Sequence, residues 1–220
     1  MKKYVLIVAG GNGNRFGGEV PKQFILINGK PLLLHTINAF LRVDQSFRLV
    51  LVLPDKMVEH WKSICKEYHF KHNHLIVSGG EDRQWSVMAG LKYIPDDSLV
   101  AIHDGVRPVV SARLIEEGFR LAKEKGSAIP VVEVTDSVRE VGGKGNSVVN
   151  RENLRLVQTP QIFYAEKIKR AYLKAGDRSY SDDASVYENV CNEVYLFSGE
   201  RENIKITYPV DLISLEALLK

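Results

Sequence analysis

A glycine-rich segment near the start of the chain is the feature that most constrains its fold and function. Residues 10–18 read GGNGNRFGG and directly follow residues 4–8, an apolar run that is predicted to form a buried strand. Five glycines in nine residues leave backbone N–H groups uncovered, and Arg15 and Lys22 add positive charge close by. Open α/β sheets place ligands at the carboxyl ends of their strands. The segment therefore predicts a polyphosphate site, with a flexible glycine turn as the alternative.

Two known phosphate-binding patterns do not fit this segment. Gly11 and Gly13 match the first two glycines of the dinucleotide pattern G-x-G-x-x-G, but Phe16 occupies the position of the third. The P-loop pattern ends in Gly-Lys-Ser/Thr, whereas residues 17–19 read GGE. A dinucleotide-dependent dehydrogenase and a P-loop protein are therefore disfavoured.

The composition predicts one globular domain over residues 1–220. Hydrophobic residues make up 45% of the chain and charged residues 26%, which is enough apolar material for a sizeable core. The net charge of +3 is too small to indicate nucleic-acid binding. Cys65 and Cys191 lie far apart, as expected for reduced thiols, and no apolar stretch approaches the length of a membrane span. We therefore expect a cytoplasmic protein that binds neither nucleic acid nor a membrane.

Short β-branched runs alternate with longer segments of helical periodicity. The near-continuous apolar run at residues 50–53 indicates a strand buried on both faces, which is typical of a parallel sheet covered by helices. Strands are predicted at residues 4–8, 48–53, 74–77, 99–103, 127–132 and 193–197. Helices are predicted at residues 31–42, 56–68, 83–93, 111–125, 165–175 and 209–219. Ser111 is the predicted N-cap of the helix at 111–125, and Gly126 stands just past its end. The pattern predicts a three-layer α/β/α fold with a mostly parallel sheet.

Residues 133–158 break this alternation. A glycine-rich stretch at 142–146 lies between two polar, valine-containing arms at 134–141 and 147–156, which indicates a long β-hairpin. A two-stranded ribbon is marginally stable in water by itself. The hairpin is therefore predicted to be an arm exchanged between identical subunits, with a mobile loop as the alternative.

The sequence HDGVRP at residues 103–108 directly follows an apolar strand. A single carboxylate at a strand end, Asp104, suits Mg²⁺, which takes one or two protein carboxylates together with substrate phosphates. Arg107 is then available either to a phosphate or to Asp104. The alternative is a turn with a local ion pair, and His103 is predicted to be a packed core residue.

Two further segments place polar groups at the start of predicted helices. GGEDRQWS at residues 79–86 offers free N–H groups and the Ser86 hydroxyl, with Asp82 as the predicted N-cap. Ser181, in SDDAS, offers a hydroxyl to an anion. The sequence contains no G-x-S-x-G, no HExxH and no catalytic Cys/His pair. Many anion-binding groups without a nucleophile are typical of phosphoryl or nucleotidyl transfer.

Taken in order, several segments resemble the cytidylyltransferases that activate sugar-alcohol phosphates. They are AGGNGNRFG, PKQF, GGEDRQWSV, HDGVRP, DSVR, NR, TPQIF, SDDAS and ENIKIT, and they extend over nearly the whole chain. The resemblance implies a Rossmann-like sheet and a homodimer that exchanges hairpin arms. It also implies CTP and a polyol phosphate as substrates, with Mg²⁺. The SDDAS segment and the NRxxLR spacing favour 2-C-methyl-D-erythritol 4-phosphate as acceptor over ribitol 5-phosphate.

The resemblance further implies a role for individual residues. Those that would surround the nucleotide are Ala9, Gly10, Gly11, Gly13, Gly80, Glu81 and Ser86. Those with catalytic roles would be Arg15, Lys22, Arg151 and Lys205. Those on the acceptor side would be Asp104, Arg107, Ser137, Arg151, Thr159, Ser181 and Lys205, with Asp104 also as the metal ligand and with Ser137 and Arg151 reaching in from the partner's arm.

Four positions depart from the pattern of this family. Ser137 and Ser181 stand where threonine is usual, Glu202 where aspartate is usual, and Gly10 where alanine is common. The serines keep the hydroxyl group. A non-catalytic nucleotide-binding protein of the same fold is the rival interpretation, and it is disfavoured because the phosphate-binding cations and the metal carboxylate are all present.

Overall fold

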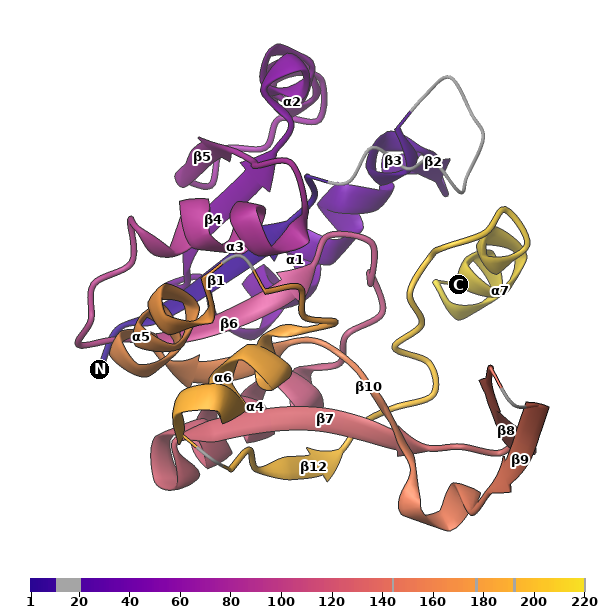
Figure 1. The fold of residues 1–220 in the computed structure, drawn as a ribbon. Helices are drawn as coiled ribbons and strands as arrows, with labels where there is room; N and C mark the ends of the chain where they lie inside the picture. Colours follow the sequence, from indigo (N-terminus) through magenta and orange to yellow (C-terminus); the bar gives the residue numbers. More distant parts are fainter. Residues whose placement is uncertain (11–20, 144, 177, 192, 220) are drawn as a thin grey trace.

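The computed structural model describes residues 1–10, 21–143, 145–176, 178–191 and 193–219. A central sheet runs through the molecule with helices on both faces (Figure 1). Its strands, among the described residues, are β1 (Lys3–Val8), β4 (Arg48–Leu53), β5 (His74–Ser78), β6 (Leu99–Asp104), β7 (Ser127–Glu133), β10 (Arg155–Val157), β11 (Gln161–Tyr164) and β12 (Leu196–Ser198). Their order is β10-β7-β11-β6-β1-β4-β5, with β12 beside β7. The predicted three-layer α/β/α fold is confirmed.

The half of the sheet around β1 is parallel. β1 pairs in parallel with β4 and with β6, and β4 pairs in parallel with β5. β11 lies between β6 and β7 and is antiparallel to both, and β10 is antiparallel to β7. The carboxyl ends of β1, β4, β5 and β6 therefore meet at one edge, where ligands of open α/β sheets bind.

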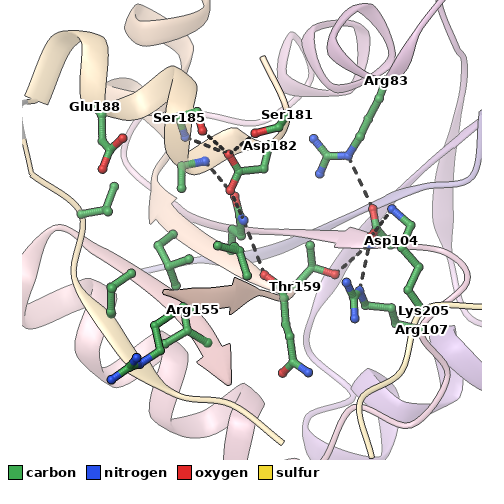
Figure 2. Close-up of a pocket in the computed structure, with 18 of the residues that line it drawn as sticks. Arg83, Asp104, Arg107, Arg155, Thr159, Ser181, Asp182, Ser185, Glu188 and Lys205 are labelled. Carbon is green, nitrogen blue, oxygen red and sulfur yellow. Dashed lines mark hydrogen bonds and ion pairs between the residues drawn. The ribbon is translucent and has the colours of Figure 1, made fainter. Parts of the chain in front are cut away.

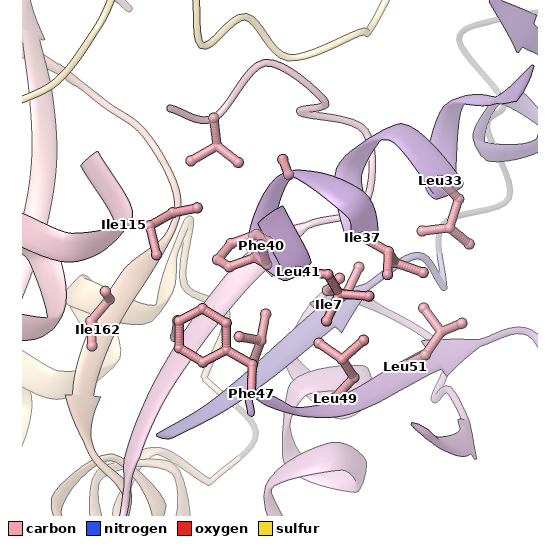
Figure 3. Close-up of a cluster of buried hydrophobic side chains, with 14 of the residues drawn as sticks. Ile7, Leu33, Ile37, Phe40, Leu41, Phe47, Leu49, Leu51, Ile115 and Ile162 are labelled. Carbon is pink, nitrogen blue, oxygen red and sulfur yellow. The ribbon is translucent and has the colours of Figure 1, made fainter. Parts of the chain in front are cut away.

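Helices cover both faces of the sheet because successive side chains of a strand point to opposite faces. Val5 and Ile7 of β1 pack in one core cluster, whereas Tyr4 and Leu6 pack in the other. The first cluster includes residues of α1 (Leu32–Val43), α2 (Val58–Glu67) and α4 (Ala112–Lys125), and the second includes residues of α3 (Arg83–Leu91), α5 (Ala165–Ala175) and α6 (Asp183–Cys191). Figure 3 shows Ile7 of the sheet close to Ile37 and Leu41 of α1.

Local capping explains where α4 begins and ends and where α3 begins. The Ser111 side chain accepts a hydrogen bond from the N–H of Leu114, and Gly126 ends α4 with φ +95°, a conformation that glycine adopts without strain. The Asp82 carboxylate accepts from the N–H of Trp85 and begins α3. These predicted caps are confirmed. No helix among the described residues is long and apolar enough to cross a membrane.

A third, smaller core holds the C-terminal segment beside the sheet edge. Ile27, Leu32, Val106, Ile206 and Leu215 form this cluster. The remaining short elements are β2 (Leu26–Ile27), β3 (Lys30–Pro31) and α7 (Asp211–Leu218), with the 3₁₀ turns η1 (Lys22–Phe24), η2 (Asp55–Met57) and η3 (Arg151–Asn153). This packing brings the chain near residue 205 to the loop after β6.

The predicted hairpin is present but shorter than expected. β8 (Val138–Gly142) and β9 (Gly145–Val149) form a separate two-stranded sheet that extends away from the body (Figure 1). Val141 and Val148 on it are 81% and 75% exposed. The predicted arm ran to residue 158, but Arg155–Val157 instead pairs with β7, whose end offers an antiparallel partner.

The last predicted strand, residues 193–197, was also misplaced. The structure forms it at Leu196–Ser198, because β12 takes its register from β7, with Leu196 opposite Ile129 and Ser198 opposite Val131.

The presence of a core cluster on each face of the sheet leads to a prediction about stability. Leu6→Ala and Ile7→Ala should each lower the free energy of unfolding by about 2–5 kcal/mol, because each removes a fully buried side chain from a different face of β1. Leu173→Ala, at a position that is 76% exposed, should change it by about 0.5 kcal/mol or less. Urea unfolding measures all three. A large loss for only one of the two β1 variants would contradict the three-layer arrangement.

Candidate functional site

Two adjoining pockets open at the carboxyl edge of the parallel strands, and they share Arg83, Asp104 and Lys205. The first, which we call the glycine-loop pocket, has a volume of about 620 Å³ and lies between the end of β1 and the loop at residues 79–82. The second, the α6 pocket, has a volume of about 520 Å³ and lies against the start of α6 and strand β10 (Figure 2). A group bound in one pocket can therefore reach a group bound in the other at Asp104.

Asp104, the last residue of β6, is the charged centre of the site. Its carboxylate lies 3.0 Å from Nζ of Lys205, 3.3 Å from Nε of Arg107 and 3.5 Å from Nε of Arg83. Burial alone would raise the pKa of the Asp104 carboxyl, but the charges of Arg83, Lys205 and Arg107 outweigh it and hold that pKa far below its usual range. Asp104 is therefore an anion at any physiological pH, and three cations converge on it.

His103 supports Asp104 from behind and has no exposed surface. The backbone N–H of Asp104 donates to the hydroxyl oxygen of Thr159 (3.1 Å), so that this hydroxyl is left to donate to Nδ1 of His103 (3.1 Å). Nε2 of His103 then donates to the carbonyl of Arg107 at 3.0 Å. Burial lowers the pKa of His103 to about 4. The ring is neutral and hydrogen-bonded on both nitrogens, which confirms the prediction of a packed core residue.

Close backbone approach shapes the glycine-loop pocket. The N–H of Gly80 donates to the Ser86 hydroxyl oxygen at 3.2 Å, and that hydroxyl donates to the carbonyl of Asp82 at 2.8 Å. A Cβ atom at Gly10 would lie 2.8 Å from the same oxygen, so an alanine there would force Ser86 to shift. Gly10 in place of the more usual alanine is thus matched to the observed position of Ser86.

Lys22 is placed by a buried glutamine. Gln23, 1% exposed, donates from Nε2 to the carbonyl of Ala9 at 3.0 Å and ties the 3₁₀ turn η1 to the end of β1. The adjacent Lys22 lines the glycine-loop pocket and donates from Nζ to the carbonyl of Ile206 at 3.1 Å. The lysine therefore sits between the start of the chain and its C-terminal segment.

A pair of buried amides, Gln158 and Asn203, places Lys205. Gln158 donates from Nε2 to the carbonyl of Glu200 (2.7 Å) and accepts from the N–H of the same residue (3.2 Å). Asn203, which has no exposed surface, donates from Nδ2 to the carbonyl of Thr159 at 2.8 Å. These bonds fix the segment before Lys205 against the residues that follow β10.

The structure brings many of the predicted site residues together. Ala9, Gly10, Lys22, Gly80, Glu81, Ser86, Asp104 and Lys205 line the glycine-loop pocket. Asp104, Arg107, Thr159, Ser181 and Lys205 line the α6 pocket. Gly11, Gly13 and Arg15 lie outside the described residues. Ser137 and Arg151 are exposed at the base of the hairpin and line neither pocket of their own chain.

Sequence reasoning missed one pair of charged residues at this site. Nη1 and Nη2 of Arg83 lie 3.0 and 2.6 Å from Oδ1 and Oδ2 of Asp183, whose side chain is fully buried. Both residues stand in segments already singled out, GGEDRQWS and SDDAS, but their pairing spans 100 positions and no local pattern signals it.

Known proteins match this chain over nearly its whole length. A sequence model of the family described as 2-C-methyl-D-erythritol 4-phosphate cytidylyltransferase (IspD) matches residues 4–220. Over 219 residues the chain is 45% identical to the protein of that name from Phocaeicola vulgatus, and the match covers all of both chains. The crystal structure of the protein of that name from Thermus thermophilus is 33% identical, has a TM-score of 0.81, and is matched over 99% of this chain and 98% of its own.

A second solved structure has the same fold. The 4-diphosphocytidyl-2C-methyl-D-erythritol synthase from Anaerococcus prevotii is 27% identical, with a TM-score of 0.85 over 99% of this chain and 96% of its own. Fold, site segments and sequence match thus agree. This chain belongs to the 2-C-methyl-D-erythritol 4-phosphate cytidylyltransferase family.

Proposed function

We propose that this chain transfers the cytidylyl group of CTP to 2-C-methyl-D-erythritol 4-phosphate, giving 4-diphosphocytidyl-2-C-methyl-D-erythritol and pyrophosphate. The observation that carries the proposal is the junction of two pockets at Asp104, Arg83 and Lys205. CTP occupies the glycine-loop pocket, with its base near Gly80 and Ser86. The acceptor occupies the α6 pocket, so that its phosphate meets the α-phosphorus of CTP at the junction.

The transfer needs positioning and positive charge more than acid–base chemistry. The acceptor phosphate is already an anion near neutral pH and attacks the α-phosphorus directly, so no general base is required. This agrees with His103, which is buried, neutral and hydrogen-bonded on both nitrogens. Lys22 and Lys205 stabilise the charge that develops on the phosphates and on the departing pyrophosphate.

The donor set at the junction fits a magnesium ion that arrives with the nucleotide. Among the described residues there is no group of three His, Cys, Asp or Glu side chains that would hold a metal unaided. Asp104 supplies one anionic oxygen ligand, and Mg²⁺ characteristically uses one or two carboxylates together with substrate phosphates. Bound there, the ion would neutralise phosphate oxygens of CTP. Asp104 must then share its carboxylate between the metal and the three cations that contact it.

The hairpin supports a homodimer in which each active site is shared. Arg151 and Ser137 lie at its base, where Nη1 of Arg151 donates to the carbonyl of Thr135. The ribbon is exposed on both strands and carries Val141 and Val148 into solvent. A partner subunit would cover these side chains, and its α6 pocket would receive the two polar groups. We therefore assign Arg151 to the acceptor phosphate of the neighbouring subunit.

The acceptor and the role of Lys22 are tested together. With CTP and Mg²⁺, pyrophosphate release should be fastest with 2-C-methyl-D-erythritol 4-phosphate and much slower with ribitol 5-phosphate. Lys22→Ala should lower kcat by about 100-fold or more and change KM less, because its charge acts mainly in the transition state. Lys174→Ala, at an exposed position of α5, is the control. A higher kcat/KM with ribitol 5-phosphate would overturn the acceptor assignment.

The shared site is tested by mixing two inactive variants. Lys22→Ala and Arg151→Ala should each be nearly inactive as homodimers. A mixture that has exchanged subunits should recover activity, because one of the two sites in each heterodimer is then wholly wild type. Subunit exchange is followed with differently labelled chains. If exchange is complete and no activity returns, the arm serves its own chain.

A further inference from the structure

Arg83 is placed where the two pockets meet, although none of the roles assigned above includes it. It is the first residue of α3 and follows the glycine loop at residues 79–82 directly. Its side chain lines both the glycine-loop pocket and the α6 pocket. Contacts that fix the Arg83 side chain therefore affect the shape of both pockets.

The hydrogen-bonding groups of Arg83 are directed at two carboxylates from different parts of the fold. The two terminal nitrogens pair with both oxygens of Asp183, and Nε lies 3.5 Å from Oδ1 of Asp104. The paired fork is the geometry in which arginine binds a carboxylate most strongly. Burial alone would lower the pKa of Arg83, but Asp183 and Asp104 outweigh it and raise the pKa above its usual value. The guanidinium is thus a permanent charge with its fork already occupied.

Asp183 is held as firmly from its other side. Its side chain is fully buried and accepts a hydrogen bond from the Tyr172 hydroxyl at 2.5 Å. It is also the first residue of α6, whose neighbouring side chains Ser181, Asp182 and Ser185 line the α6 pocket (Figure 2). We call these three side chains at the start of α6 the acceptor wall. The position of Asp183 therefore sets the position of the acceptor wall.

The start of α6 is also attached to β11. Gln161 donates from Nε2 to Oδ2 of Asp182 at 2.8 Å, and its Oε1 accepts from the N–H of Ala184 at the same distance. Gln161 fixes the acceptor wall to the sheet, whereas Arg83 joins it to the glycine loop and to Asp104. The charged link between the start of α6 and the glycine-loop pocket thus passes through Arg83.

We propose that Arg83 is a positioning residue that aligns the acceptor wall on α6 with the nucleotide pocket through its paired contact with Asp183. The inference rests on the proposed function. Because the fork is occupied by Asp183, Arg83 acts through α6 and leaves the phosphates to other cations. The glycine loop keeps its own hydrogen bonds, such as Gly79 N–H to the Leu53 carbonyl at 2.7 Å. Loss of the pair should therefore weaken the acceptor site more than the CTP site.

The kinetics of conservative variants test whether the acceptor site is weakened more than the CTP site. Arg83→Lys keeps the charge but cannot pair with both oxygens of Asp183. It should raise KM for the acceptor by about tenfold or more, a change of about 1.4 kcal/mol, while KM for CTP changes by less than about threefold. Asp183→Asn should give the same pattern, and the double variant should be little worse than either single one, because the same contact is lost. Arg120→Lys, on the exposed face of α4, is the matched control and should change neither KM.

A milder variant tests the same contact if Arg83→Lys or Asp183→Asn fails to fold. A structural measurement tests it if the proposed reaction is not observed. Tyr172→Phe removes only one hydrogen bond from Asp183 and should raise KM for the acceptor about twofold to threefold in the same direction. Hydrogen exchange at the first amides of α6 should be faster in Arg83→Lys than in wild type, whichever reaction the protein catalyses.

The possible outcomes distinguish failure of the proposed function from failure of the positioning role of Arg83. If the wild-type protein releases no pyrophosphate from CTP with 2-C-methyl-D-erythritol 4-phosphate, the proposed function fails, and the hydrogen exchange of α6 alone decides on Arg83. If the wild-type protein is active, the positioning role is overturned by equal rises in both KM values. It is equally overturned by additive effects of the two single variants, or by unchanged exchange in α6.

Discussion

The carboxylate of Asp104 is the constraint on which the rest of the site depends. It is nearly buried at the end of β6, and such a charge is costly unless it is paired. Here the pairing comes from three cations, one local and two distant in sequence: Arg107 in the turn after β6, Arg83 at the start of α3, and Lys205 near the C-terminus. The need to balance this one charge holds the start of α3, the turn after β6 and the C-terminal segment around one point.

The surrounding hydrogen bonds make that arrangement rigid. Thr159 and His103 fix the backbone of Asp104 from behind, and the amides of Gln158 and Asn203 fix the segment that carries Lys205. The cations are thus positioned before any substrate binds. Fixed charges of this kind need little reorganisation during a reaction, which is how electrostatic catalysis in nucleotidyl transfer gains its advantage.

The sequence was sufficient for features that depend on local patterns. The parallel strands around β1, the caps at Asp82 and Ser111 and the glycine-rich hairpin follow from apolar runs, capping residues and turn residues that neighbour one another. Two of the segments that line the pockets, GGEDRQWS and HDGVRP, were also recognisable, because their glycines, cations and carboxylates directly follow strands or end them.

Features that depend on pairing between distant segments could not be predicted from such patterns. β10 was assigned to the arm because Arg155–Val157 gives no local sign that it will pair with β7. β11 was missed for a similar reason, since its four residues acquire their role only between β6 and β7. The Arg83–Asp183 contact likewise exists only once α3 and α6 have packed on the same face of the sheet.

We propose that Asp104 balances the cations of the site and holds the metal that arrives with the nucleotide. Calorimetric titration of CTP into wild type and Asp104→Asn, each with and without Mg²⁺, tests it most directly. Without metal the variant should bind CTP more tightly, by about tenfold, because the phosphates then meet cations that no carboxylate neutralises. Added Mg²⁺ should tighten binding to wild type much more than to the variant. Weaker metal-free binding by the variant, together with an undiminished response to Mg²⁺, would contradict this role of Asp104.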